Sequence, residues 1–374
     1  MSRGTTTTRP PSPSGEGARR AGGGSISTAP GSFRPSIDRW GQASTLLRDV
    51  EAGAVFLIDR RVARLHPKLT RAIAATKPRA VIQVTASEEL KSLSSLGEVL
   101  AELASVPRGS LLVAVGGGTV GDVAAVAAHL ARRGLRLWQV PTTLLAAADS
   151  SLGGKGALNI GGVKNSVGVF HYAERTLLCP ELFETLPDSR WREGALEALK
   201  LELCSSTRPS WPASWRSDLS WVRRARKQKA ARCAADPYET NGVRAVLNFG
   251  HTFGHALEAV SDFALPHGEA VGLGILCALD VGVSLGVTPL EVARKAEVLL
   301  EQVQGPRARE RLAKWLGRTS RAQLEKLIKA DKKATARAVR MILLRGLGDP
   351  VFQEVADPVS GVASVPPLPP FGAR

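Results

Sequence analysis

Short apolar runs alternate with amphipathic stretches along the first half of the chain. Four runs have the length and composition of buried strands, at 54–58, 79–84, 110–115 and 135–140. Between them, apolar residues recur at helical spacing over 62–75, over 90–104 and, after a glycine turn, up to Arg133. Alternating strands and helices predict an α/β domain with a parallel sheet of the Rossmann-like type.

The alternation ends near Pro187, and helical spacing dominates most of the remaining chain. Helices are predicted at 193–200, 271–287, 290–303 and 322–328, and a strand-like pattern at 339–344. We therefore expect a Rossmann-like domain over 38–187 and an all-α domain over 188–360. The proline-rich residues 361–374 are expected to form a loose tail.

Residues 1–37 are rich in Thr, Ser, Pro, Gly and Arg, and Glu16 is their only acidic residue. Such a segment cannot bury enough apolar area to fold, so we expect a disordered tail. An organelle transit peptide has a similar composition, but no amphipathic apolar face accompanies it here.

Composition and charge narrow the class of protein. A hydrophobic fraction of 44% supports a sizeable core, and a net charge of +16 suggests anionic partners. The basic residues are scattered and aromatic content is only 5%, so an enzyme with an anionic substrate fits at least as well as a nucleic-acid-binding protein. Four cysteines without a disulfide-type spacing indicate a reducing cytoplasm. The apolar stretch 271–287 contains Asp280 and is expected to be a buried helix, with no membrane span.

Three of the six histidines fall between residues 251 and 267. On a helix, His251 and His255 lie on one face, at the spacing by which two imidazoles can serve one metal or one reacting group. An isolated pair of this kind is more often part of a core. The nearby His267, Arg244, Asn248 and Glu258 favour a functional site, because buried polar groups are costly without a purpose.

Two glycine-rich segments have the character of anion sites. The strand at 110–115 runs into the turn 116–122, whose backbone N–H groups could cradle phosphate oxygens, although a tight β–α turn would look the same. Asp149–Lys155 and 163–165 add two lysines, an Asp and an Asn among glycines. Further on, Glu197 and Lys200 lie three apart on one helical face, a spacing also typical of a solvated ion pair.

Eight blocks in this order resemble 3-dehydroquinate synthase, within the sugar-phosphate cyclase superfamily. They cover about residues 53–348: GGGTVGD (116–122), PTTLLA (141–146), DSSLGGK (149–155), KN (164–165), EALK (197–200), NFGHTFGH (248–255), HGEA (267–270) and DKK (331–333).

The resemblance implies an NAD-binding domain, a helical domain and an active site in the cleft between them. Glu197, His251 and His267 would bind a divalent metal, zinc or cobalt. The implied NAD-binding residues are Glu88, Lys91, Gly118, Thr119, Val120, Gly121, Asp122, Thr142, Thr143, Lys155, Lys164, Leu182 and Thr185. The implied catalytic residues are Asp149, Lys155, Lys200, Arg244, Asn248 and His255, and Arg133, Asn165, Lys229 and Lys332 would bind substrate.

The implied reaction converts 3-deoxy-D-arabino-heptulosonate 7-phosphate to 3-dehydroquinate and phosphate. It proceeds by transient oxidation with NAD, phosphate elimination, re-reduction and intramolecular aldol closure. This chain departs from the family pattern at Arg61, Gly156 and Cys179–Pro180, which lie on the nucleotide side. The family also implies a homodimer.

Three alternatives remain at this stage. A cyclase of secondary metabolism would act on a sugar phosphate without a carboxylate, such as sedoheptulose 7-phosphate or glucose 6-phosphate. A metal-dependent polyol dehydrogenase would accumulate NADH. A basic nucleic-acid-binding protein would show salt-sensitive DNA binding without residues 1–37.

Overall fold

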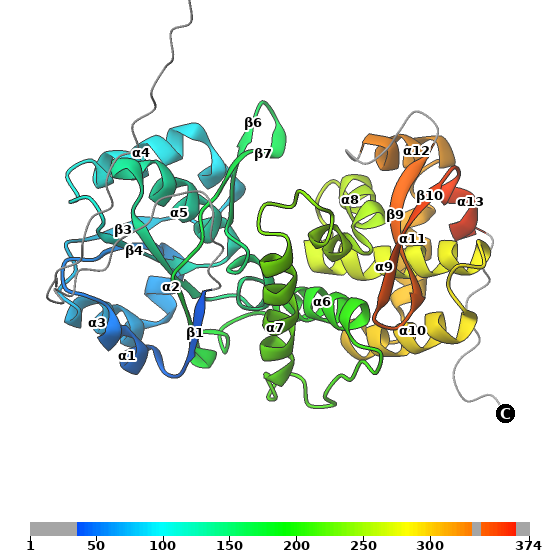
Figure 1. Cartoon of the computed structure of the whole chain (residues 1–374), viewed down its shortest axis with the longest axis horizontal. Helices are drawn as coiled ribbons and strands as arrows, with labels where there is room; N and C mark the ends of the chain where they lie inside the picture. Colours follow the sequence, from blue (N-terminus) through cyan, green and yellow to red (C-terminus); the bar gives the residue numbers. More distant parts are fainter. Residues whose placement is uncertain (1–35, 331–337, 364–374) are drawn as a thin grey trace, which may run out of the picture. The chain divides into compact units, whose positions relative to one another are not determined.

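The computed structural model describes residues 36–330 and 338–363 (Figure 1). Its main sheet is six-stranded and parallel, in the order β1-β8-β5-β4-β2-β3. The strands, in chain order, are β1 (Ile37–Trp40), β2 (Val55–Asp59), β3 (Ala80–Val84), β4 (Leu111–Gly116), β5 (Arg136–Pro141) and β8 (Arg175–Leu178). The parallel sheet predicted from the apolar runs is confirmed, and β1 and β8 are additions that the sequence pattern did not reveal.

Side chains alternate between the two faces of the sheet. Leu57 of β2 and Leu112 of β4 pack beneath α4 (Leu93–Leu103) and α5 (Gly118–Leu130). Phe56 and Val113, each one residue away from these along its strand, pack with α1 (Ala43–Leu46) and α3 (Pro67–Ala75) on the other face. Because both faces are covered, β2 and β4 are apolar along almost their whole length, which is why they were recognisable as continuous runs.

The helix predicted over 62–75 is two helices, α2 (Arg60–Leu65) and α3, interrupted at His66. Pro67 begins α3, and the residue before a proline is disfavoured in helical conformation. The shorter helical turns of this half are η1 (Leu47–Asp49), η2 (Glu88–Lys91), η3 (Ala131–Arg133) and η5 (Pro180–Leu182).

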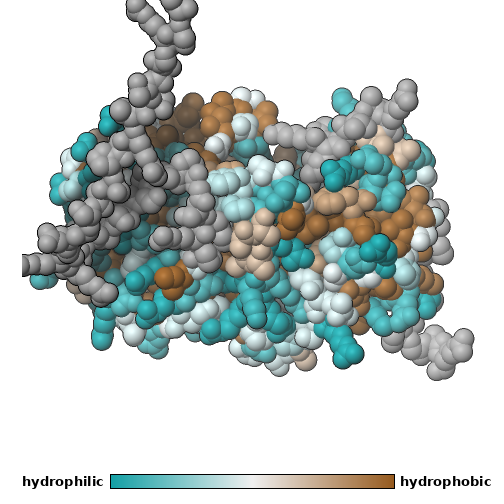
Figure 2. Space-filling view, in the orientation of Figure 1, coloured by the Kyte–Doolittle hydropathy of each residue, from teal (hydrophilic) through white to brown (hydrophobic). Residues whose placement is uncertain are grey.

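Between β5 and β8 the chain forms a π-helical turn, η4 (Ala146–Ser150), and then an antiparallel hairpin of β6 (Lys155–Ile160) and β7 (Val163–Phe170). The hairpin lies where the sequence suggested a glycine-rich loop. Val163 and Val167 are 52% and 44% exposed on it. Figure 2 shows hydrophobic surface in this part of the displayed face.

The C-terminal half contains the largest apolar core of the described chain, built mainly by helices. It is helix-rich as expected, and it also contains an antiparallel pair of strands, so it is not all-α. The elements are α6 (Asp188–Ser205), α7 (Ser220–Ala235), η6 (Arg244–Asn248), α8 (His251–Val260), α9 (His267–Ser284), α10 (Leu290–Gln304), α11 (Ala308–Leu316), α12 (Arg321–Ala330), β9 (Val339–Gly346), β10 (Asp349–Val355) and α13 (Pro358–Ala363).

Helix α9 has the length and mean hydropathy of a membrane span, but 78% of that window is buried inside the protein. Its Asp280 forms an ion pair with Arg309, 2.5 Å away. These observations agree with the buried helix predicted from the sequence.

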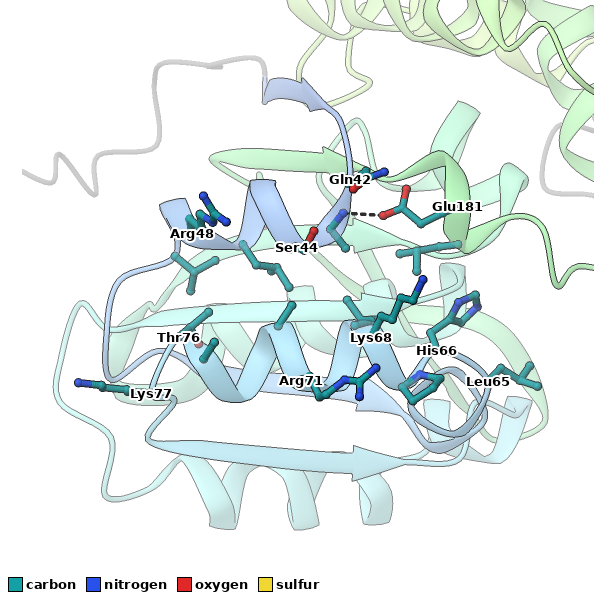
Figure 3. Close-up of a pocket in the computed structure, with 18 of the residues that line it drawn as sticks. Gln42, Ser44, Arg48, Leu65, His66, Lys68, Arg71, Thr76, Lys77 and Glu181 are labelled. Carbon is teal, nitrogen blue, oxygen red and sulfur yellow. Dashed lines mark hydrogen bonds between the residues drawn. The ribbon is translucent and has the colours of Figure 1, made fainter.

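A groove of about 1040 Å³ lies between α1 and α3, on one face of the sheet (Figure 3). Its lining includes the buried Leu47 and Leu69 and the exposed basic residues Arg48, Lys68 and Arg71. Glu197, His251 and His267 do not line this groove, so the candidate metal site lies elsewhere in the structure.

Candidate active site

Three potential metal ligands converge from three helices. Glu197 of α6, His251 of α8 and His267 of α9 each offer one ligand atom, and these atoms lie within 4.8 Å of one another. Glu197 Oε1 is 3.6 Å from Nε2 of His251 and 3.4 Å from Nε2 of His267. This carboxylate oxygen is buried and makes no hydrogen bond. One carboxylate and two imidazoles with an unpaired oxygen between them suit a catalytic divalent cation, which keeps further positions open for substrate.

Close helix packing brings these ligands together. A Cβ on Gly268, next to His267, would lie 2.4 Å from the backbone oxygen of Glu193, so α9 touches the α6 backbone one turn before Glu197. A Cβ on Gly274 would lie 2.1 Å from the oxygen of Gly250, the residue that precedes His251. Only glycine allows either approach. The glycines therefore set the distances between the three ligand-bearing helices.

Both imidazoles direct Nε2 toward Glu197. Nδ1 of His251 lies 3.3 Å from the carbonyl oxygen of Phe249, and Nδ1 of His267 lies 3.2 Å from Oε1 of Glu258. Burial and the Lys200 charge hold the pKa of His251 well below its usual value. Burial opposes protonation of His267 too, but the carboxylates of Glu197 and Glu258, one beside each ring nitrogen, raise its pKa to about 10.

Lys200 is the cationic partner of Glu197. Its ammonium donates to Glu197 Oε2 on the same helix, and both side chains are at most 3% exposed. Burial raises the pKa of Glu197, but the Lys200 charge and the two neighbouring imidazoles outweigh this and hold it well below its usual range. We call Glu197, His251 and His267 the metal group. The Lys200–Glu197 pair is buried at this group, unlike an ordinary solvated i, i+3 pair.

Helix α7 holds the π-helical turn that carries Asp149. Lys229 Nζ lies 2.8 Å from both the carbonyl and the carboxylate Oδ1 of Asp149. Arg226 donates to the Ala147 carbonyl and to Ser151 Oγ. It also forms a bidentate pair with Asp38, whose two N–O distances are both 2.6 Å. The structure thus brings the predicted Asp149 and Lys229 together.

Arg244 and Lys155 make contacts with the loop that joins α7 to η6. Arg244 is buried and donates to the carbonyls of Gly153 and Pro237, at 3.3 and 2.9 Å, while its Nε makes no hydrogen bond. Lys155 is exposed and pairs with Glu239. Asn248 ends η6, directly before the metal-ligand helix.

His255 lies beside the metal group. Its ring centroid is 5.4 Å from that of His251, and its side chain is exposed, unlike that of Glu197. The spacing argument that grouped His251 with His255 is therefore correct about the shared face, while His267 is the imidazole that joins His251 around Glu197.

The glycine turn opens α5. Gly117 is the N-cap, and a Cβ on Gly118 would lie 3.0 Å from Ser150 Oγ, a buried hydroxyl without a hydrogen-bond partner. Free backbone N–H groups and an unpaired hydroxyl form a cradle suited to a phosphate oxygen. The remaining predicted residues of this turn are placed around it: Thr119, Val120 and Gly121 in the first turns of α5, and Thr142 and Thr143 directly after β5.

Polar side chains beside this turn are paired with one another. Lys91 Nζ donates to Asp122 Oδ2 at 2.6 Å and to the side-chain oxygen of Asn165. Glu88 accepts from Asn159 of the hairpin at 2.7 Å. Burial raises the pKa of Asp122, although Lys91 opposes this. The hairpin is therefore attached to α5 and η2 through predicted nucleotide-side residues.

Most of the remaining predicted residues lie on elements other than the three ligand-bearing helices. Lys164 Nζ is 4.0 Å from the ring centroid of Phe263, in the turn between α8 and α9. Leu182 is part of the apolar lining of the α1–α3 groove, and Thr185 Oγ1 lies 2.9 Å from His66 Nε2. Arg133 follows α5 at the end opposite Gly118, roughly 20 Å along the helix axis. Lys332 lies outside the described residues.

The sequence interpretation missed Ser150, Arg226 and Glu239 as contributors. Ser150 was visible in the DSSLGGK block, but nothing in the sequence shows that its hydroxyl is buried against Gly118. Arg226 and Glu239 lie in stretches that looked like an ordinary helical connector. Their partners are at least 70 residues away along the chain, which local pattern cannot reveal.

One departure from the family pattern has a packing explanation. A Cβ on Gly156 would lie 2.7 Å from the Ala125 Cβ and 2.9 Å from the Asp122 carbonyl, so β6 lies directly on α5. A threonine there would push the hairpin away from the helix. Asp59 also has a local role, since its side chain accepts from the Arg61 backbone N–H at the start of α2.

The fold and the site define a class of protein: an α/β nucleotide-binding region joined to a helical region with a metal group. Solved structures share the fold. The chain superposes on 2-deoxy-scyllo-inosose synthase complexed with carbaglucose-6-phosphate, NAD+ and Co2+ with a TM-score of 0.76 at 22% identity, covering 89% of this chain and 99% of that chain. For ValA, the 2-epi-5-epi-valiolone synthase from Streptomyces hygroscopicus with NAD+ and Zn2+ bound, the TM-score is 0.77 at 23% identity, with 90% and 97% covered.

Sequence relatives identify the family. A profile for the 3-dehydroquinate synthase N-terminal region matches residues 81–193, and one for the C-terminal region matches residues 200–334. The 3-dehydroquinate synthase of Acidithiobacillus ferrooxidans is 35% identical over 305 residues, or 77% of this chain and 80% of the relative. That of Rhodospirillum rubrum is 37% identical over 339 residues, or 83% and 85%. The chain belongs to the 3-dehydroquinate synthase family, as the eight sequence blocks suggested.

Proposed function

We propose that this chain is a 3-dehydroquinate synthase, a carbon–oxygen lyase that converts 3-deoxy-D-arabino-heptulosonate 7-phosphate to 3-dehydroquinate and inorganic phosphate. Family membership supports this reaction. The structural observation that carries the proposal is Glu197 Oε1, a buried oxygen without a hydrogen bond between two imidazole Nε2 atoms. Leaving such an oxygen unpaired is costly, and a divalent cation removes that cost.

The donor sets fit the cofactors of the family. Glu197, His251 and His267 would hold the divalent metal, zinc or cobalt, and the Gly118 turn with Ser150 would hold the pyrophosphate of NAD. When bound, NAD supplies reversible oxidation of the substrate, and the metal supplies Lewis-acid activation of its hydroxyl.

The protein side chains position the substrate and move its protons. Lys155, Lys229 and Arg244 provide positive charge for the carboxylate and phosphate of the substrate. Lys200 and His255 lie next to the metal ligands, where they can hydrogen-bond a reacting hydroxyl. Asp149 fixes the Lys229 ammonium. Asn248 precedes the metal-ligand helix, and Asn165 lies on the hairpin. We assign Arg133 and Lys332 to substrate binding on family resemblance alone.

The setting of the enzyme follows from the same proposal. We expect a cytoplasmic protein, since Cys179, Cys204, Cys233 and Cys277 are free and buried. Burial raises the pKa of Cys204 to about 12, so this thiol stays protonated. A homodimer is expected, and the exposed valines of the hairpin offer an apolar surface for it. No role for nucleic acid or membrane is proposed.

Phosphate release tests the proposal. Purified protein with NAD and Zn2+ or Co2+ should release phosphate from 3-deoxy-D-arabino-heptulosonate 7-phosphate, and a chelator should abolish this. Sedoheptulose 7-phosphate and glucose 6-phosphate should release little. Preferential release from either of those sugars would favour a secondary-metabolism cyclase, and steady accumulation of NADH with a simple polyol would favour a dehydrogenase.

A further inference from the structure

The second ring nitrogen of His267 faces a carboxylate that has no role in the reaction as proposed. Oε1 of Glu258 lies 3.2 Å from Nδ1, while Nε2 on the other side of the ring lies 3.4 Å from Glu197 Oε1. The Glu258 side chain is 15% exposed, so it is largely removed from bulk water. The His267 ring is therefore held between two carboxylates, one on each nitrogen.

Helix α8 explains why Glu258 reaches this position. Glu258 is seven residues, or about two turns, after His251, which places both on one face of the helix. That face lies against α9, and a Cβ on Gly254, between the two residues, would be 3.2 Å from the Val271 Cα. One face of α8 thus supplies the metal ligand His251 and the Glu258 carboxylate that contacts the metal ligand His267.

An imidazole can bind a cation through Nε2 only when its proton is on Nδ1. His251 secures this state through the Phe249 carbonyl, a neutral acceptor, at 3.3 Å. His267 has an anionic acceptor instead. A carboxylate both fixes the ring orientation and makes the opposite nitrogen a stronger donor.

We propose that Glu258 is a positioning residue that holds His267 in the Nδ1–H tautomer and aims Nε2 at the cation beside Glu197. This inference rests on the metal site of the proposed function. It adds a carboxylate that acts on the cation through His267 without touching it.

A competing arrangement uses the same residues differently. His255, Glu258 and His267 also offer ligand atoms within 4.8 Å of one another. A cation bound there would make Glu258 a direct ligand. Occupation of both positions would require both nitrogens of His267 to lose their protons, which a neutral imidazole resists. The number of bound ions distinguishes the two roles.

The test is Co2+ binding by the full chain, measured by competition with a chromophoric chelator and by the visible absorption of the bound ion. The variants are Glu258→Gln, Glu258→Ala and the control Asp262→Asn. Asp262 lies in the turn between α8 and α9, is exposed and has a φ of 51°, a conformation that asparagine tolerates. Thermal unfolding of each metal-free protein checks the fold.

We expect Asp262→Asn to match the parent chain. Glu258→Gln, which keeps an acceptor oxygen, should lose roughly tenfold in affinity and Glu258→Ala up to about 100-fold, each with an altered absorption spectrum and one ion per chain at saturation. Parent-like affinity and spectrum in both variants would overturn the inference alone. A fall from two ions to one would make Glu258 a direct ligand instead. No Co2+ binding by the parent chain would refute the metal site itself.

Discussion

The metal group and the nucleotide side of this protein differ in how their polar atoms are arranged. Around Glu197, the two Nε2 atoms and the carboxylate oxygen face one another and leave that oxygen without a hydrogen bond. Beside the glycine turn, Lys91 is already paired with Asp122 and Asn165, and Lys155 with Glu239. The metal ligands are thus brought together in advance by helix packing, whereas the lysines predicted on the nucleotide side already have side-chain partners, which they would have to release to bind a ligand.

The largest effect is expected from removing the Glu197 charge. Glu197→Gln leaves the buried Lys200 ammonium without its anion, so the metal-free protein should lose about 3–5 kcal/mol of unfolding free energy in urea and should no longer retain Zn2+. The double variant Glu197→Gln/Lys200→Met should recover most of the stability while still lacking the metal. If Glu197→Gln kept both its unfolding free energy and its Zn2+, the Glu197 carboxylate would not be a metal ligand.

Metal affinity should depend steeply on pH. His267 is protonated in the metal-free protein below its pKa of about 10, and a cation can bind Nε2 only after that proton leaves. Raising the pH toward 10 removes the competing proton, so apparent affinity should rise about tenfold per pH unit. Chelator competition at several values between pH 6.5 and pH 8.5, corrected for protonation of the chelator, measures this slope. An affinity independent of pH would show that no proton is displaced.

Gly268→Ala should disturb the metal group through packing alone. The added Cβ would meet the Glu193 backbone and move the start of α9 away from α6, at a cost of about 1–3 kcal/mol and with weaker metal binding. Gly97→Ala in α4 is the control, because nothing lies within 4 Å of its Cβ. That variant should be slightly stabilised, by about 0.5–1 kcal/mol. Urea unfolding of both proteins compares them directly.

Ser150→Ala is expected to have the smallest effect, and it should change NAD binding without changing metal binding. Losing one hydroxyl contact of about 1 kcal/mol should weaken NAD binding roughly fivefold and leave Zn2+ affinity unchanged. Isothermal titration with NAD, and then with Zn2+, measures both quantities. A matching loss of Zn2+ affinity would mean that the regions are coupled rather than separate.

The sequence predicted those parts of the fold that local pattern encodes. The central strands β2 and β4 are nearly continuous apolar runs, β5 is apolar apart from Arg136 and Gln139, and α9 is an apolar helix, so these elements were recognisable. The edge strand β1 was not recognisable, because it has only four residues. The hairpin β6/β7 was not recognisable either, because its half-exposed, glycine-containing strands lack a clear alternation of apolar and polar residues. The pair β9/β10 was half recognised, since only β9 is buried along most of its length.

The candidate site divides in the same way. Glu197, His251 and His267 were proposed from sequence blocks, and the structure brings them together. The contacts that support them were not predictable, because Glu258, Arg226 and Glu239 reach their partners through helix packing and loop conformation. Spacing along one helix suggested His251 and His255 as a pair, while the second imidazole near Glu197 comes from the next helix.

The most direct test counts metal ions on the chain. Metal-free protein titrated with Co2+ should bind one ion tightly, and the visible absorption bands should indicate mixed imidazole and carboxylate ligands. His251→Ala should bind none at the same concentration, while His255→Ala should still bind one. Full retention of the ion by His251→Ala, or absence of binding by the unaltered chain, would contradict the shared site of Glu197, His251 and His267.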